Sequence, residues 1–275
     1  MRSITRHTLC ALAILFGGQH AHALTSESCG PEQALEPTSS FGGKGKIWYG
    51  KPTTFNKNPW QVGLVIDGDL ECGGSAIGER SIVTAAHCLA GIPDDAKVEV
   101  MVGSTDFNGG VSIDVEKFVV HPEYNEDTCA NDVAMVWVDS TRPAMAIALP
   151  TPGTHIRIGE HLTATGFGET EDGAPSDQLL EGKVPYVDNE TCNRPESYGG
   201  QILPGMMCAG SESGGTDACK GDSGGPLTKG HGANAVLVGI TSWGDECGKP
   251  LKYGVYTRVS YYLEWIVKEM SKHGD

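Results

Sequence analysis

Beyond residue 46, short apolar runs rich in β-branched residues recur along the chain, separated by Gly, Pro, Asn and Asp. A spacing of about a dozen residues between such runs is typical of all-β proteins, because each run suits one strand and each gap holds a turn. The pattern therefore predicts a fold of many short strands. The expected strands are 61–66, 75–84, 98–103, 111–120, 133–138, 161–166, 236–242 and 255–259.

One segment near the C-terminus has a helical period instead. Between about Ser260 and Ser271, the apolar residues Leu263, Ile266 and Val267 recur every three to four positions. Ser260 is a suitable N-cap for such a helix. We expect two β-barrels packed side by side, followed by this terminal helix.

Composition mainly excludes other classes of protein. The chain has 275 residues, of which 39% are apolar and 38 are glycine, and its formal net charge is -15. This apolar content excludes global disorder, and glycines without a three-residue period indicate tight turns rather than collagen. Because nucleic-acid binding needs a surplus of Lys and Arg, the acidic charge argues against it and favours basic partners.

Residues 1–23 have the parts of a secretory signal peptide, with Arg2 and Arg6 before an apolar stretch and small residues around His22. The apolar stretch, from Leu9 to Phe16, is far shorter than the ~20 residues that span a bilayer. We expect a secreted, extracellular protein without a membrane anchor. Removing Cys10 with the signal leaves an even number of the 9 cysteines, which predicts a disulfide framework.

Residues 24–46 are rich in Ser, Gly, Pro and Glu and end in a short basic stretch at Lys46. An apolar run starts immediately afterwards at Ile47. Such a stretch fits either a processing site or a linker.

Three motifs carry residues suited to acyl transfer. Ser223 stands among glycines in 221–226, where a sharp turn can expose its hydroxyl and free main-chain N–H groups. His87 ends one apolar strand beside a cysteine, and Asp132 opens another. Taken singly, the motifs also fit a glycine loop, a core histidine and a strand-end cap.

Together, the three motifs resemble those of the chymotrypsin-like (trypsin-like) serine proteases, in that family's order of His, Asp and Ser. Further matches lie at 59–62, 72–75, 121–125, 162–166, 242–244 and 254–257. The resemblance implies an all-β fold of two packed six-stranded antiparallel β-barrels with a C-terminal α-helix. The catalytic domain would span 47–275, with its cleft between the barrels.

The resemblance also implies a serine endopeptidase. Ser223 would attack the scissile carbonyl, His87 would transfer its proton, and Asp132 would orient the imidazole. The N–H groups of Gly221 and Ser223 would bind the oxyanion. The alternative is a catalytically silent, protease-like binding module, although such proteins usually lack a triad residue that this chain has.

Trypsin-like specificity follows from the same resemblance, which places Asp217 at the base of the primary pocket and predicts cleavage after Arg or Lys. Ala218 stands where many trypsins have serine. Without that hydroxyl a lysine loses a hydrogen-bond partner, whereas a guanidinium still binds the carboxylate with both nitrogens, so Arg should be preferred. A digestive protease and a narrow cascade protease both remain open. Lys220 would either favour acidic residues in the substrate or simply be solvated. The other substrate-binding candidates are Ser242, Trp243, Gly244 and Gly254.

The family's activation mechanism would make residues 24–46 a propeptide. Cleavage between Lys46 and Ile47 would free an amine to pair with Asp222. The sequence departs from the family's Ile-Val-Gly-Gly at Trp48 and Tyr49. Because Lys rather than Arg precedes the cut, we expect another protease to activate this one.

The expected partners are protein or peptide substrates with Arg or Lys at the cut, an activating protease and protein inhibitors, and the enzyme should be a monomer. No cofactor or metal is expected, since Asp106, Asp114 and Glu116 do not form a matched calcium-binding set, although Tyr253 is typical of sodium-binding members. Asn189 lies in a glycosylation sequon.

The disulfides implied by the family are Cys72–Cys88, Cys192–Cys208 and Cys219–Cys247. Cys29–Cys129 is the remaining pair, with intermolecular bonds as its alternative.

Overall fold

The computed structural model describes residues 47–106, 109–168 and 176–274. The predicted signal peptide (1–23) and leader (24–46), with Cys29 and Lys46, lie outside these residues.

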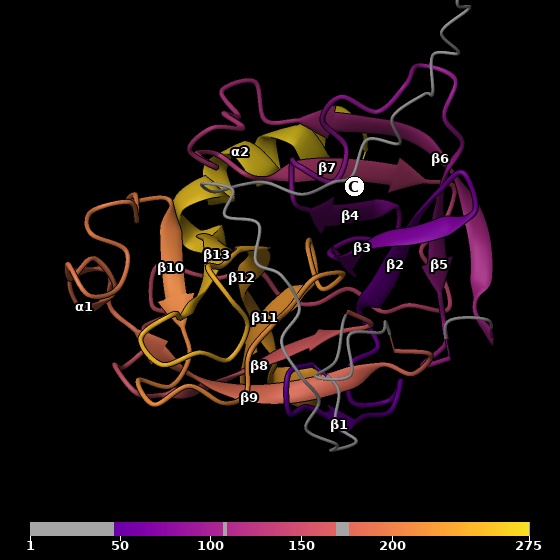
Figure 1. Cartoon of the computed structure of the whole chain (residues 1–275). Helices are drawn as coiled ribbons and strands as arrows, with labels where there is room; N and C mark the ends of the chain where they lie inside the picture. The colour runs from indigo at the N-terminus through magenta and orange to yellow at the C-terminus, as the bar shows by residue number, and fades with distance from the viewer. Residues whose placement is uncertain (1–46, 107–108, 169–175, 275) are drawn as a thin grey trace, which may run out of the picture.

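The first barrel is a closed sheet of six antiparallel strands in the order β2-β3-β4-β7-β6-β5 (Figure 1). The turn between its first two strands is Asp67-Gly68, and both residues have positive φ, of 52° and 96°. This is the geometry that a two-residue hairpin with a right-handed twist requires. The strands are β2 (Gln61–Ile66), β3 (Asp69–Ala76), β4 (Ser81–Thr84), β5 (Val98–Val102), β6 (Val111–Val120) and β7 (Ala134–Val138).

The second barrel closes in the order β9-β10-β13-β12-β11-β8, with β8 pairing back to β9, and β1 (Lys51–Pro52) joins the outer edge of β9. Figure 1 shows it in orange beside the indigo and magenta strands of the first barrel. The predicted fold class is thereby confirmed. The strands are β8 (His161–Gly166), β9 (Leu180–Val187), β10 (Met206–Ala209), β11 (Pro226–Lys229), β12 (Val236–Trp243) and β13 (Gly254–Arg258), accompanied by the one-turn helix α1 (Asn189–Cys192) and the 3₁₀ turn η2 (Gly232–Asn234).

The terminal helix α2 (Val259–Lys272) corrects two details of the sequence prediction. Its N-cap is Arg258, whose side chain makes no capping hydrogen bond, so Ser260 lies inside the helix. Its buried face carries Tyr262 and Ile266, whereas Val267, expected in the apolar stripe, is 50% exposed. Starting from the second barrel, α2 returns to the first, where the His273 ring packs 4.2 Å from that of Trp137. No described helix is long and apolar enough to cross a membrane.

The segment predicted as one strand over 75–84 forms two strands. The N–H groups of Ile77 and Gly78 both donate to the carbonyl of Ser81, at 2.9 and 3.2 Å, and this closes a turn between β3 and β4. The turn sends β4 toward β7 and leads the chain to His87.

Candidate active site

Asp132 joins the two barrels and holds His87. Its carboxylate is 1% exposed, and its Oδ2 lies 2.8 Å from His87 Nδ1, while the His87 N–H donates to Oδ1 at 2.9 Å. From the second barrel, the Ser242 hydroxyl donates to Oδ2 and the Thr257 hydroxyl donates to the Asp132 carbonyl, both at 2.5 Å. Both carboxylate oxygens are therefore engaged.

Burial by itself raises the pKa of Asp132, but the neighbouring His87 and the hydrogen bonds from His87 and Ser242 lower it by more. The net pKa is below the ordinary value, so this carboxylate stays ionised at neutral pH. An ionised carboxylate at Nδ1 favours the imidazole tautomer with its proton on Nδ1. That tautomer leaves Nε2 able to accept a proton.

The loop that carries Ser223 packs against the segment between β4 and His87. The N–H of Gly73 donates to the Ser223 carbonyl at 2.7 Å, and a Cβ on Gly224 would lie 3.2 Å from the nitrogen of Ala85. Gly224 also has a φ of +74°, which L side chains rarely adopt. The fold thus brings the serine loop, from the second barrel, to the histidine segment of the first.

Two main-chain donors in this loop are left open. The N–H groups of residues 222, 224 and 225 each donate to a main-chain carbonyl, at 2.8 to 3.0 Å. The N–H groups of Gly221 and Ser223 donate to none of the residues that the structure describes. Two neighbouring N–H groups without acceptors can stabilise negative charge that develops on a substrate oxygen.

Asp217, predicted to form the base of the primary pocket, is a buried carboxylate with incomplete hydrogen bonding. The residue is 4% exposed, its Oδ2 accepts from the N–H of Gly248 at 3.1 Å, and its Oδ1 has no hydrogen-bond partner within the described part of the chain. A Cβ on Gly254 would lie 2.6 Å from that Oδ1. Burial raises the pKa of Asp217 to about 7, and the N–H groups of Gly248 and Ala218 oppose this rise.

The other residues predicted to line this pocket differ in their exposure. A Cβ on Gly244 would meet nothing within 4 Å, so the space there is open. The disulfide Cys219–Cys247 joins the residue after Ala218 to the residue before Gly248. Ala218 and Trp243 are partly buried, and Lys220 is exposed. Tyr256 was not among the residues predicted from the sequence. Its hydroxyl is buried and has no hydrogen-bond partner in the described part of the chain.

Asp222 is the third buried carboxylate, 1% exposed, and it accepts N–H groups of Gly168 and Cys219, each at 2.9 Å. Over the described ranges no cation pairs with it, and burial raises its pKa to about 7. Ile47 is also fully buried, but no hydrogen bond between described residues joins it to Asp222 in this intact chain. Both members of the predicted activation pair are thus buried in the same barrel.

The structure contains the disulfides Cys72–Cys88, Cys192–Cys208 and Cys219–Cys247, which confirms the three pairs implied by the family. Cys129 is buried, and because Cys29 lies outside the described residues, their pairing stays a prediction. Among the described residues, one cluster has the composition of a metal site, Cys72, His87 and Cys88, but its two sulfur atoms are joined to each other and offer no thiolate.

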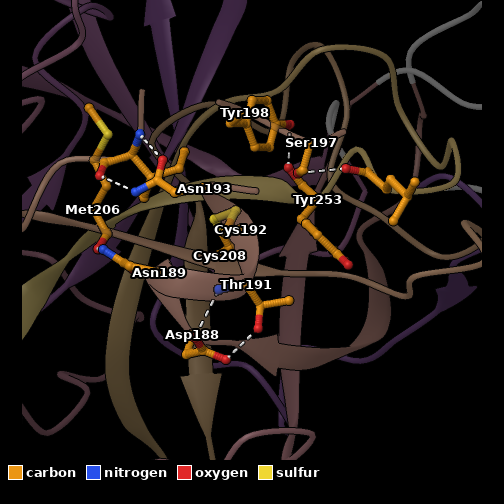
Figure 2. Close-up of a disulfide and its surroundings, with 12 residues drawn as sticks. Asp188, Asn189, Thr191, Cys192, Asn193, Ser197, Tyr198, Met206, Cys208 and Tyr253 are labelled. Atoms are coloured by element: carbon orange, nitrogen blue, oxygen red, sulfur yellow. Dashed lines mark hydrogen bonds between the residues drawn. A yellow bond between two sulfur atoms is a disulfide. The ribbon is translucent and has the colours of Figure 1, made fainter. Parts of the chain in front are cut away.

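Side chains near the disulfide Cys192–Cys208 hold the segment just before β13, and the sequence prediction missed them. Figure 2 shows the Tyr198 hydroxyl donating to the carbonyl of Tyr253, at 2.6 Å, and the Ser197 hydroxyl donates to the carbonyl of Leu251 at 2.7 Å. The Tyr198 ring also meets Trp243 edge-on, with ring centroids 5.0 Å apart. No sequence pattern could indicate a pair 55 residues apart.

Asn189, the predicted glycosylation site, lies close to Met206 in Figure 2. Its Nδ2 donates to the carbonyls of Leu203 and Met206, at 3.2 and 3.0 Å, and its Oδ1 accepts from Arg258 at 2.9 Å. A glycan replaces one Nδ2 hydrogen and would leave one donor for two carbonyls. In the folded protein a glycan on Asn189 would therefore break one of these hydrogen bonds, and glycosylation stays a prediction.

Two closed β-barrels with a buried Asp-His pair and an adjoining serine loop define the class of chymotrypsin-like serine proteases. A family model described as Trypsin matches residues 47–266, and the chain belongs to this family. It is 37% identical to transmembrane protease serine 11E of Mus musculus and 36% identical to transmembrane protease serine 11G of Rattus norvegicus, in each case over 227 residues. Each alignment covers 80% of this chain and 54% of the relative, so the chain spans about half the length of these curated relatives.

Proposed function

We propose that the chain is the precursor of a secreted serine endopeptidase that cleaves after Arg and, less efficiently, after Lys. The observation that carries this proposal is Asp217, a buried carboxylate with one oxygen lacking any partner among the described residues. A buried charge without a counter-ion is costly, so a pocket with this base favours a cationic side chain.

The proposed reaction proceeds through an acyl-enzyme. Ser223 Oγ forms a bond to the scissile carbonyl carbon while His87 Nε2 takes the hydroxyl proton. The oxygen that becomes negative is bound by the N–H groups of Gly221 and Ser223. His87 then gives its proton to the departing amine, and water releases the acyl group by the same steps in reverse order. Asp132 keeps the imidazole oriented and stabilises its positive charge.

We further propose that cleavage between Lys46 and Ile47 activates the enzyme. The new Ile47 ammonium would supply the cation that the described residues do not provide to Asp222. This pair would hold the loop of the oxyanion N–H groups in place. Because Lys precedes the cut, another protease should perform it, and rapid self-processing that a Ser223→Ala variant lacks would contradict this.

We propose that residues 1–23 are a signal peptide and that the leader (24–46) is an activation peptide, with the protease domain delivered to the extracellular side. A disulfide between Cys29 and Cys129 would keep the cleaved leader attached. The mass of the activated protein measured without and with reductant tests this tether, since the leader should separate only after reduction.

The competing function is a silent, protease-like binding module. A fluorophosphonate reagent distinguishes the two functions, because it bonds only to a serine activated as a nucleophile. After verified cleavage at Lys46, we expect stoichiometric labelling that a Ser223→Ala variant abolishes. Cleaved protein that resists labelling would indicate the binding module.

A further inference from the structure

Trp48, where the chain departs from the family's activation sequence, touches the base of the specificity pocket through its main chain. It forms an isolated antiparallel bridge with Asp217, and the Asp217 N–H donates to the Trp48 carbonyl at 3.2 Å. The residue that follows the fully buried Ile47 therefore fixes the backbone of the pocket carboxylate.

The indole of Trp48 packs on Gly248, whose N–H donates to the same carboxylate. It lies directly against the main chain of Gly248, since a Cβ on that glycine would overlap the indole atoms Cδ1 and Nε1. The N–H of Gly248 is the group that donates to Asp217 Oδ2, at 3.1 Å. The absence of a side chain at Gly248 makes the room for the tryptophan.

We propose that Trp48 is a positioning residue for primary specificity, holding Gly248 so that its N–H fixes the Asp217 carboxylate toward an incoming substrate cation. This inference rests on the proposed function, in which Asp217 binds that cation. It assigns a purpose to the substitution of tryptophan for the family's small valine.

A glycine needs such support because its own backbone restricts it little. Gly248 has a φ of +68°, one of several conformations that glycine adopts at small cost. An indole packed on one face limits the directions in which its N–H can point. The direction matters, because this hydrogen bond does most to oppose the rise that burial causes in the pKa of Asp217.

The test uses the full chain cleaved after Lys46, with the new N-terminus checked by sequencing. Two quantities are compared between wild type, Trp48→Val and Trp48→Phe. The first is the inhibition constant of benzamidine, whose cationic amidine occupies the primary pocket. The second is the rate of labelling by a small fluorophosphonate, which needs the nucleophile but no cation site. Tyr49→Gly is the matched control, because Tyr49 is 58% exposed and glycine is the family's residue there.

We expect Trp48→Val to weaken benzamidine binding about tenfold, the effect of losing one well-placed hydrogen bond to a charged group, while the labelling rate changes less than twofold. Trp48→Phe should recover most of the affinity, and Tyr49→Gly should match wild type. Unchanged benzamidine binding in Trp48→Val would overturn the proposal. Equal losses in both measurements would also overturn it, because they indicate failure of the whole activated loop. If wild type itself is not labelled, the proposed function fails instead.

Discussion

At the scale of single residues, three buried aspartates differ in what compensates their burial. Asp132 has a histidine and hydroxyl donors, and its pKa lies below the ordinary value. Asp217 and Asp222 have only main-chain N–H donors among the described residues, and burial raises both pKa values to about 7. For each of these two carboxylates we propose a cation. The substrate supplies it to Asp217, and the Ile47 ammonium supplies it to Asp222.

Replacing Asp217 tests the first of these assignments. Asp217→Ser should lower kcat/KM for Arg and Lys reporter peptides by about two to three orders of magnitude, because a cation then enters a buried site without its counter-charge. Fluorophosphonate labelling should persist, since the triad is untouched. If Arg cleavage were as fast in the variant as in wild type, Asp217 would not be the specificity residue.

Replacing Ala218 tests its proposed role in the choice between Arg and Lys. Ala218→Ser adds a hydroxyl that can accept a hydrogen bond from a lysine ammonium, whereas a guanidinium already binds the carboxylate through two N–H groups. We expect the ratio of kcat/KM for Arg over Lys reporters to fall about fivefold to tenfold, mainly through faster Lys cleavage. A ratio that stays the same would contradict this role for position 218.

For Asn189 the structure and the sequon make opposite predictions, and we favour the structure. When the protein is produced in a cell that glycosylates, its intact mass should not change on treatment with peptide N-glycosidase, because the folded amide is committed to two carbonyls. A mass loss that a Thr191→Ala variant does not show would establish the glycan.

At the scale of elements, the stability gained when the Ile47 terminus pairs with the loop before Ser223 should depend on pH. A folded-state pKa of about 7 for Asp222, above its ordinary 3.8, means that the uncut protein loses stability as pH rises from about 4 through 7. The loss is on the order of 4 kcal/mol at most. After cleavage, the Ile47 ammonium should offset it.

We therefore expect the melting temperature of the cut form to exceed that of the uncut form by a margin that grows between pH 5 and pH 7.5. Measuring both forms as Ser223→Ala prevents self-digestion, and the pH dependence due to Asp217 cancels in the difference. Asp222→Asn should make the margin independent of pH. A constant margin in the unsubstituted pair would show that Asp222 does not receive the new terminus.

The sequence predicted most elements of the first barrel and fewer of the second, for physical reasons. Strands such as β7 are continuous apolar runs that include valines, a signature that sequence patterns detect. The strands that were missed lack that signature: β9 contains a glycine and a proline, β10 consists of Met, Cys and Ala, and β11 begins at a proline. Their strand conformation comes from neighbours in the closed barrel rather than from local preference.

At the scale of the whole molecule, the candidate site could be predicted where its residues lie in local motifs. The segments around His87, Asp132 and Ser223 each carry a recognisable pattern; the fold joins His87 to Asp132 and packs the Ser223 loop against the first barrel. The supports could not be predicted, because the Thr257 hydroxyl donates to Asp132 from 125 residues away and Trp48 packs on Gly248, which lies near the other end of the chain. Such contacts depend on tertiary packing that no local pattern encodes.

The most direct test of the central claim is the hydrolysis of matched Arg, Lys and Phe reporter peptides by the chain before and after verified cleavage between Lys46 and Ile47. We predict turnover only after cleavage, fastest for Arg, slower for Lys, and absent in Ser223→Ala. Cleaved wild-type protein that hydrolyses none of the reporters, or that cleaves after Phe faster than after Arg, would contradict the proposal that this member of the trypsin family is an Arg-directed endopeptidase.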